Sequence, residues 1–299
     1  MSTDAKRAKW AQDTLSYFLD KKYVNSKGET VDLFLSEHSG NYIPESVSQQ
    51  MVMGFESTIQ YLHSNIKVQN IGAIEAANEL VLVGKTAILN FASAIKPGGG
   101  FLSGKQAQEE ALARSSNLLF SLVKAPDYYS KNIEQNTPFY THDMIYSHGV
   151  TFIRHSNGDL MDTPFQADVI TSPAVNLGEA IEQRIWEKFT WMYDLNEYTY
   201  SIMDERIKRV LTIALFTRCE NLVLGAWGCG IFKCDPNRIA GLFAKHLIDG
   251  QFYNKFKNIT FAVLDGPKET LVKAFKINIE DAWNKDVKLD KYITSEYGN

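Results

Sequence analysis

The 299-residue sequence predicts an α/β protein in which helices cover both faces of a largely parallel sheet. Three observations support this fold class. Short continuous apolar runs at 85–91, 221–226 and 259–264 are typical of strands buried on both faces. Helical patterns of apolar residues lie between these runs, and turn formers follow them. Alternating buried strands and helices favour a layered α/β fold.

The first part of the chain contains one clear helix and a long polar stretch. Residues 5–19 carry apolar side chains at helical spacing. Residues 23–50 are rich in turn formers, so we expect loop there, with one short strand near 31–35. The run at 66–69 fits a strand or a loop. Residues 74–82 predict a helix.

The middle of the chain centres on the apolar run 85–91, which predicts a central strand. A glycine-rich loop follows it, and a helix is expected to begin at Gln108. Residues 125–144 are aromatic and polar without a clear period, which predicts irregular structure. Strands are expected at 149–154 and 167–172.

The last part alternates helices with two strands. Residues 179–200 predict helix with a break near 196–198, and 203–219 predict a strong amphipathic helix. The strand at 221–226 leads to Asp235-Pro236, an N-cap followed by proline at the first helical position. After this helix we expect a strand at 259–264 and a final helix at 269–275.

Neither an internal repeat nor a low-complexity linker divides the sequence, so we expect a single domain over residues 1–299. Within it, residues 1–60 are expected to form a helical and loop extension. Residues 284–299 are expected to form a flexible tail.

Composition excludes several classes of protein. The net charge is −4 and the pI is about 5.9, so there is no broad basic field for sequence-specific nucleic-acid binding. No apolar run reaches the about 18 residues of a membrane span, and the N-terminus lacks the apolar core of a secretion signal. Three cysteines predict reduced thiols rather than a disulfide framework. We expect an intracellular monomer that does not contact membranes.

Two glycine loops follow buried strands. Pro97–Gly100 follows the strand 85–91, and Gly225–Gly230 follows the strand 221–226 and precedes the helix at Asp235. Ligands of open α/β sheets bind beyond the carboxyl ends of the strands. Glycine amides and a helix N-terminus both favour an anion, so the two loops could clamp a diphosphate. Each loop alone is also compatible with a tight turn.

Other glycine patterns and metal sites are less consistent with the sequence. The spacing in Gly225–Gly230 is G-x-x-G-x-G, which is not the dinucleotide fingerprint. Gly99–Lys105 nearly matches a P-loop, but Gln106 stands where a magnesium-binding Ser or Thr is required. The cysteines and histidines lack the spacing of a zinc site, so we expect no metal and no cofactor.

An acid pair, Glu109-Glu110, begins the helix after the first loop. Neighbours on a helix point about 100° apart, so the two carboxylates would have different roles. A glutamate near a diphosphate and partly buried could keep its proton at neutral pH, as a general acid requires. The alternative is an exposed helix start in which Glu110 pairs with Arg114.

The segments LNFASAIKPGGGFLSGKQAQEEALARSSNLL (89–119) and LVLGAWGCGIF (222–232) resemble the microbial-type poly(ADP-ribose) glycohydrolases. The resemblance rests on the family motif GGG-x6–8-QEE joined to the second glycine loop, and it extends over about residues 5–275. One departure is Ala174-Val175-Asn176, where the family often has Ala-Pro-Asn.

This resemblance implies a macrodomain, a three-layer α/β/α sandwich that binds ADP-ribose. It also implies hydrolysis of the ribose–ribose bond of poly(ADP-ribose) carried on modified proteins. Glu110 would be the general acid/base, Glu109 would bind the ribose at the scissile bond, and Gln108 would fix the loop. The remaining implied contacts are to the diphosphate (Gly98, Gly99, Gly100, Ala226, Trp227, Gly228, Cys229, Gly230, Ile231), to the terminal ribose (Phe232) and to the distal ribose (Asn90).

Two other functions fit parts of the sequence. A macrodomain that binds ADP-ribose without cleaving it needs only the glycine loops, so the Glu109-Glu110 pair favours the enzyme. A P-loop nucleotide hydrolase is opposed by Gln106.

Overall fold

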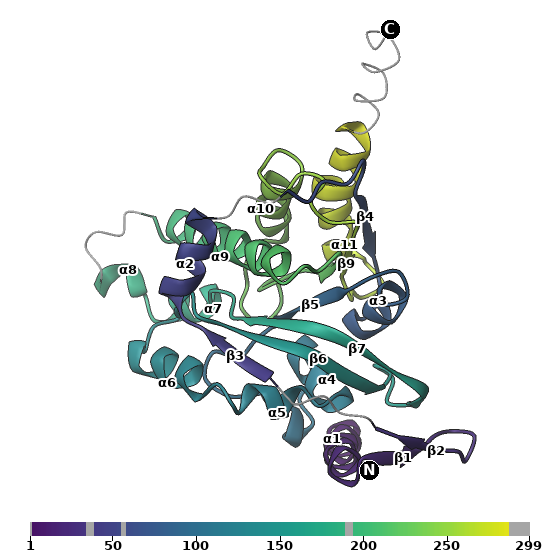
Figure 1. Cartoon of the computed structure of the whole chain (residues 1–299). Coiled ribbons are helices and arrows are strands. Elements are labelled where there is room, and N and C mark those ends of the chain that lie inside the picture. Colours follow the sequence, from purple (N-terminus) through teal and green to yellow (C-terminus); the bar gives the residue numbers. More distant parts are fainter. Residues whose placement is uncertain (1, 34–38, 55–57, 189–193, 287–299) are drawn as a thin grey trace, which may run out of the picture.

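A computed structural model describes residues 2–33, 39–54, 58–188 and 194–286 (Figure 1). Its helical elements are α1 (Thr3–Asp20), α2 (Glu45–Met53), α3 (Ala73–Leu80), the 3-10 turn η1 (Phe101–Ser103), α4 (Gln108–Ser115), α5 (Leu118–Leu122), α6 (Pro126–Gln135), α7 (Leu177–Glu182), α8 (Ile185–Lys188), α9 (Leu195–Phe216), α10 (Pro236–Leu247), α11 (Thr270–Phe275) and the π-helical η2 (Lys276–Glu280). Its strands are β1 (Lys22–Val24), β2 (Thr30–Asp32), β3 (Ser39–Ile43), β4 (Asn65–Gln69), β5 (Thr86–Phe91), β6 (Met144–Arg154), β7 (Leu160–Ser172), β8 (Asn221–Leu224) and β9 (Asn258–Ala262).

Among the described residues, seven strands form one mixed sheet in the order β3-β6-β7-β5-β8-β9-β4. The pairs β7–β5, β5–β8, β8–β9 and β9–β4 are parallel, whereas β3–β6 and β6–β7 are antiparallel. A separate small hairpin joins β1 to β2. The predicted largely parallel sheet is therefore confirmed, with β5 in its middle.

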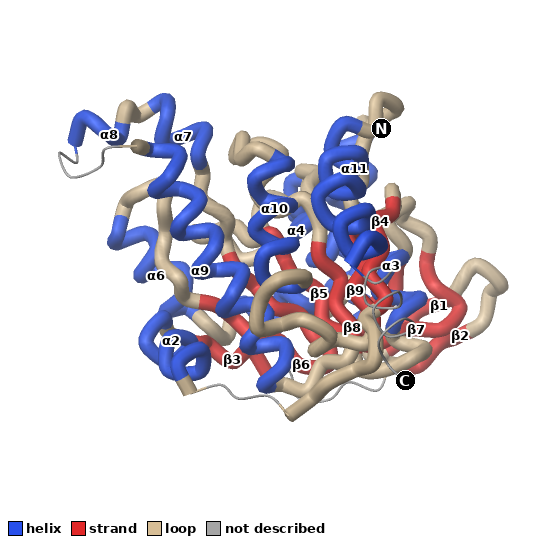
Figure 2. Tube along the Cα trace, turned by 90° about the horizontal axis from the view of Figure 1, so that it is seen from above, coloured by secondary structure: helices blue, strands red, loops and turns tan. Residues whose placement is uncertain are grey.

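Helices cover both faces of the sheet (Figure 1). Successive side chains of a strand point to opposite faces, and β5 follows this rule. Ala87 and Leu89 pack in the core beneath α9 and α10, whereas Ile88 packs in the core beside α3, α4 and α5. Figure 2 shows α9, α10 and α11 in that order along one face. The result is the expected three-layer α/β/α sandwich.

The elements that lead to the glycine loops agree with the prediction. β5 is buried along nearly its whole length, and α4 begins at Gln108. The Asp235 side chain caps α10 by accepting the Arg238 amide at 2.9 Å, and Pro236 is the first helical residue. In α9, the predicted apolar face is buried.

The expectation for residues 23–50 was largely wrong. Residues 39–43 form β3, which pairs with β6 at the edge of the main sheet, and residues 45–53 form α2. The proposed 1–60 extension is thus partly integrated into the sheet. The strand expected near 31–35 is β2, although residues 34 and 35 lie outside the described part of the chain.

Two further expectations need correction. Residues 126–135 form α6 within the stretch expected to be irregular, because Tyr128 and Tyr129 pack into the core. The expected break near 196–198 is absent, since α9 runs through it from Leu195. Of the predicted tail, residues 284–286 are helical and residues 287–299 lie outside the described residues.

The structure also shows the state of the cysteines and the character of the described helices. Cys219, Cys229 and Cys234 are all free thiols. Of the helices in the described part of the chain, none combines the length and apolar character needed to cross a membrane.

Candidate active site

The two glycine loops lie side by side because their strands pair in parallel. β5 and β8 are neighbours with Thr86 opposite Asn221, so their carboxyl ends meet at one edge of the sheet. A pocket of about 880 Å³ opens there. Both loops, the start of α4 and the ends of β4, β7 and β9 contribute to its wall. This is the position in which open α/β sheets bind ligands.

The first loop holds the acids of α4. Gly100 donates its amide to Oε1 of Glu110 at 2.9 Å, and the Gly98 amide interacts with the carboxyl of Glu109. Gly99 has φ +59° and donates to the Lys96 carbonyl at 3.0 Å. A Cβ on Gly99 would overlap the Glu110 carboxylate. The three glycines therefore let the main chain approach both acids closely.

Glu109 is the more deeply buried acid, with only 3% of its surface exposed. Its Oε2 accepts the Ser93 amide at 2.7 Å and its Oε1 accepts the Asn90 side-chain amide at 3.3 Å. Burial raises the pKa of Glu109 to about 8, although these hydrogen bonds oppose the rise and the charge of Glu110 adds to it. Glu109 is thus largely protonated at neutral pH.

Glu110 differs from its neighbour in access. Its side chain is half-buried and lines the pocket, held by the single Gly100 bond. The exposed Glu110–Arg114 ion pair considered from the sequence is not what forms, because Arg114 is buried and donates to the Lys105 carbonyl at 3.0 Å. Burial lowers the pKa of Arg114 to about 10, so it stays charged at neutral pH.

Gln108 at the start of α4 and Asn90 near the end of β5 lie next to the acids. The Gln108 side chain donates to the Leu89 carbonyl at 2.7 Å and accepts the Phe91 amide at 2.9 Å, which ties α4 to the strand. Asn90 is fully buried, donates to Glu109 and Thr171 and is not among the residues that line the pocket, and its contact with a distal ribose stays a prediction. It lies beneath Glu109 instead of on the wall.

The second loop presents amides that the protein itself does not use. Within the described residues, the amides of Gly230, Ile231 and Phe232 have no hydrogen-bond partner, and all three residues line the pocket. Consecutive unpaired amides are suited to an anion. Of the other predicted loop residues, Ala226, Trp227 and Gly228 line the pocket, with the Trp227 side chain fully buried.

Two predicted binding residues lie behind the wall. Gly98 is buried under the first loop, where a Cβ would lie 3.0 Å from the Phe101 ring. Cys229 is not among the residues that line the pocket, and its Sγ lies 3.7 Å from the Trp227 carbonyl. Burial raises the pKa of the Cys229 thiol, which disfavours the reactive thiolate.

Sequence reasoning missed several residues of the pocket wall. The Phe232 ring faces Tyr140, with the ring centroids 6.4 Å apart, and Tyr140 has φ +56°. Asn176 follows the end of β7 and also lines the pocket. Asn176 could have been predicted as a wall residue, because it follows a predicted parallel strand. Tyr140 could not, because it lies in the stretch expected to be irregular. Further missed wall residues at the β4 and β9 side are Ile71, Gly72, Ala73, Ile74, Val263, Leu264 and Leu271.

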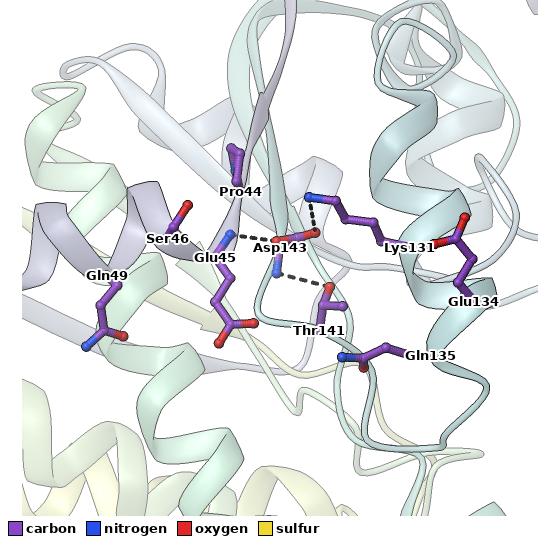
Figure 3. Close-up of a pocket in the computed structure, with 9 residues that line it drawn as sticks. All are labelled: Pro44, Glu45, Ser46, Gln49, Lys131, Glu134, Gln135, Thr141 and Asp143. Atoms are coloured by element: carbon purple, nitrogen blue, oxygen red, sulfur yellow. Dashed lines mark hydrogen bonds and ion pairs between the residues drawn. The ribbon is translucent and has the colours of Figure 1, made fainter.

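A second pocket of about 710 Å³ lies between the start of α2 and α6 (Figure 3). Asp143 accepts the Glu45 amide there at 2.6 Å, and the Lys131 Nζ lies 3.8 Å from Asp143. The lining contains three carboxylates, Glu45, Glu134 and Asp143, and one lysine, which disfavours a phosphate-bearing ligand. The pocket between the glycine loops is therefore the candidate active site.

Metal ligands do not gather in the described part of the chain: no three His, Cys, Asp or Glu side chains are placed to hold an ion. The pocket instead joins an acid pair to unpaired backbone amides at the carboxyl ends of parallel strands. Fold and site together define a macrodomain-like α/β protein whose ligand pocket carries an acid pair.

Comparisons with known proteins specify the family. The sequence model of the microbial-type poly(ADP-ribose) glycohydrolase (PARG) catalytic domain matches residues 11–155. The crystal structure of PARG from Thermomonospora curvata matches with a TM-score of 0.84 and 31% identity, over 92% of this chain and 100% of that chain. PARG from Deinococcus radiodurans in complex with ADP-ribose matches with a TM-score of 0.73 and 33% identity, over 82% and 94%. No curated protein matches the chain.

The chain therefore belongs to the microbial-type poly(ADP-ribose) glycohydrolase family. It carries the catalytic domain of that family and is a glycosidase that acts on poly(ADP-ribose). The predicted family, fold class and enzyme class are confirmed.

Proposed function

We propose that this chain hydrolyses the ribose–ribose O-glycosidic bond of poly(ADP-ribose) on modified proteins, with Glu110 as the general acid/base. The observation that carries the role of Glu110 is the contrast between the two acids. Both acids line the pocket, but Glu110 is half-buried and held by one hydrogen bond from the loop, whereas Glu109 is only 3% exposed and accepts several hydrogen bonds. Only an accessible carboxyl can exchange a proton with substrate and water.

The proposed reaction uses one acid for both proton transfers. Glu110 donates its proton to the leaving 2′-oxygen as the bond from that oxygen to C1″ breaks. The ribose passes through an oxocarbenium-like state, and water attacks C1″ and gives a proton back to Glu110. The products are free ADP-ribose and a polymer shortened by one unit that carries a 2′-hydroxyl. Neutral Glu109 would donate a hydrogen bond to the terminal ribose and orient it.

Binding would come from the second loop. The unpaired amides of Gly230, Ile231 and Phe232 are the group suited to the diphosphate, and the Phe232 ring would pack against the terminal ribose. The amides of Gly99 and Gly100 are already paired, with the Lys96 carbonyl and with Glu110, so these two glycines would form the opposite wall. The structures of relatives in complex with ADP-ribose and with the inhibitor ADP-HPD support a ligand of this class. Holding the diphosphate would fix the scissile bond beside Glu110.

Substitution of the acid tests this proposal. We expect Glu110→Gln to lower kcat for release of ADP-ribose from polymer by at least about 100-fold, because it removes the proton donor and acceptor. The Kd for ADP-ribose, measured by calorimetry, should stay within about threefold. Glu79→Gln, an exposed glutamate on α3, is the matched control and should keep full activity.

Two results would count against the proposal. Substantial turnover by Glu110→Gln would remove Glu110 from the role of acid/base. Binding of ADP-ribose by the wild-type chain without any turnover of polymer would favour the alternative, a macrodomain that only binds ADP-ribose.

A further inference from the structure

The segment 101–107 connects the first glycine loop to α4. On one side it follows Gly100, whose amide holds Glu110, and on the other it precedes Gln108, which ties α4 to β5. Gln106 within the segment lines the pocket. A shift of this segment would therefore change the separation between Gly100 and the Glu110 carboxylate.

The N-terminal helix α1 contacts this segment through one arginine. Arg7 donates from Nε to the Gly104 carbonyl at 2.7 Å and from Nη1 to Oε1 of Gln106 at 2.7 Å. Its Nη2 pairs with Asp4 on the same helix, and only 14% of the Arg7 side chain is exposed. All three guanidinium nitrogens are thus engaged, as the planar fork of arginine allows.

The main chain of the segment 101–107 packs closely against α1. Gly104 has φ +79°, and a Cβ on it would overlap the carbonyl of Asp4. From the other side, Arg114 of α4 donates to the Lys105 carbonyl at 3.0 Å. Two arginines therefore hold three consecutive residues, one from α1 and one from the helix that carries the acids.

We propose that Arg7 is a positioning residue for hydrolysis, acting through the segment 101–107 on the Gly100–Glu110 hydrogen bond. The inference rests on the proposed role of Glu110. It gives α1 a part in catalysis, although Arg7 lies outside the residues 11–155 that match the family's catalytic domain. It also gives Gln106 a function: its amide oxygen accepts the bond from Arg7 in the place where a P-loop would carry a hydroxyl.

Steady-state kinetics on polymer test the proposal in the full chain. For Arg7→Ala we expect kcat to fall about tenfold, which corresponds to about 1.4 kcal/mol, while KM and the Kd for ADP-ribose stay within about twofold. Binding should persist because the unpaired amides lie on the second loop. Arg7→Lys keeps the charge but loses the fork, so its kcat should lie between those of Arg7→Ala and the wild type.

Lys9→Ala is the matched control, because Lys9 lies on the same helix and pairs with Asp13 at its surface. It should keep full activity. An unchanged kcat in Arg7→Ala, or equal losses in Arg7→Ala and Lys9→Ala, would overturn the proposal. If Arg7→Ala does not fold, Arg7→Lys decides: kcat reduced at constant KM supports the role, and wild-type kinetics refute it. A wild-type chain without turnover would instead contradict the proposed function.

Discussion

At the scale of single residues, the Glu109 carboxyl couples ionisation to folding. Its pKa is raised from 4.5 to about 8, mainly by burial. A carboxyl that binds its proton more tightly in the folded state stabilises the fold fully below its unfolded pKa. This contribution is lost as the pH rises towards the folded pKa. The contribution of Glu109 to stability therefore declines as the pH rises from about 4.5 to about 8.

We predict that Glu109 makes stability fall between about pH 4.5 and pH 8, with a slope of at most about 1.4 kcal/mol per pH unit. Urea unfolding of the wild type and of Glu109→Gln across this range measures the effect. The stability of the wild type relative to the variant should decline as the pH rises, since other groups titrate alike in both chains. Parallel pH profiles would contradict the prediction.

The sequence placed both acids at the glycine loop, where the structure has them, but it did not predict the partners around them. The Asn90 side chain could have faced the pocket or the interior, and only its contacts with Glu109 and Thr171 decide between these positions. Arg206 is a second polar residue whose partners the sequence did not predict. It lies on the apolar face of α9 and donates from Nη1 to the Pro173 carbonyl at 3.1 Å. Such long-range bonds between polar groups leave no periodic signal in a sequence.

At the scale of elements, the segments that frame the site were predictable because their local signals agree with their environment. β5 is an apolar run buried on both faces, and α10 has both its N-cap and its proline. β3 was missed because an edge strand of polar and glycine residues gains its order from pairing with β6. α6 was missed because its helical pattern depends on two adjacent tyrosines that pack into the core.

The second loop gives a prediction that separates binding from folding. A Cβ added to Gly230 would meet no atom within 4 Å, and Gly230 does not have a left-handed φ. Gly230→Ala should therefore change the free energy of unfolding by less than about 0.5 kcal/mol. The added methyl group stands in the pocket wall, where we expect it to weaken ADP-ribose binding about tenfold by calorimetry.

The control for this experiment is Gly241→Ala in α10, where a Cβ also meets open space. This variant should bind ADP-ribose like the wild type, and its helix should become slightly more stable. Equal affinities for Gly230→Ala and Gly241→Ala would show that the second loop does not hold the ligand.

At the scale of the whole molecule, the pocket wall gathers residues from Ile71 near β4 to Leu271 in α11. Both layers of helices and the sheet between them thus contribute to one site. A ligand there would bind only the chain in which all these elements are in place, so its binding energy would stabilise the fold as a unit.

We therefore predict that thermal unfolding shows one transition, as expected for a single domain, and that ADP-ribose shifts this transition as a whole. At 100 times its Kd, ADP-ribose should add about 2.7 kcal/mol to the free energy of unfolding. Differential scanning calorimetry with and without ligand measures both quantities. Two transitions, one of them insensitive to ADP-ribose, would contradict the prediction of a single domain.

The two halves of the pocket differ in how they arise along the chain. The bond between Gly100 and Glu110 spans 10 residues, and the bond between Asn90 and Glu109 spans 19. The second loop joins them only when Asn221 comes to lie opposite Thr86, a contact far apart in sequence and slow to form. During synthesis from the N-terminus, a nascent chain could therefore form the hydrogen bonds to Glu109 and Glu110 before it could bind a diphosphate. The complete pocket would arise last, once β8, β9 and α11 have all taken their places.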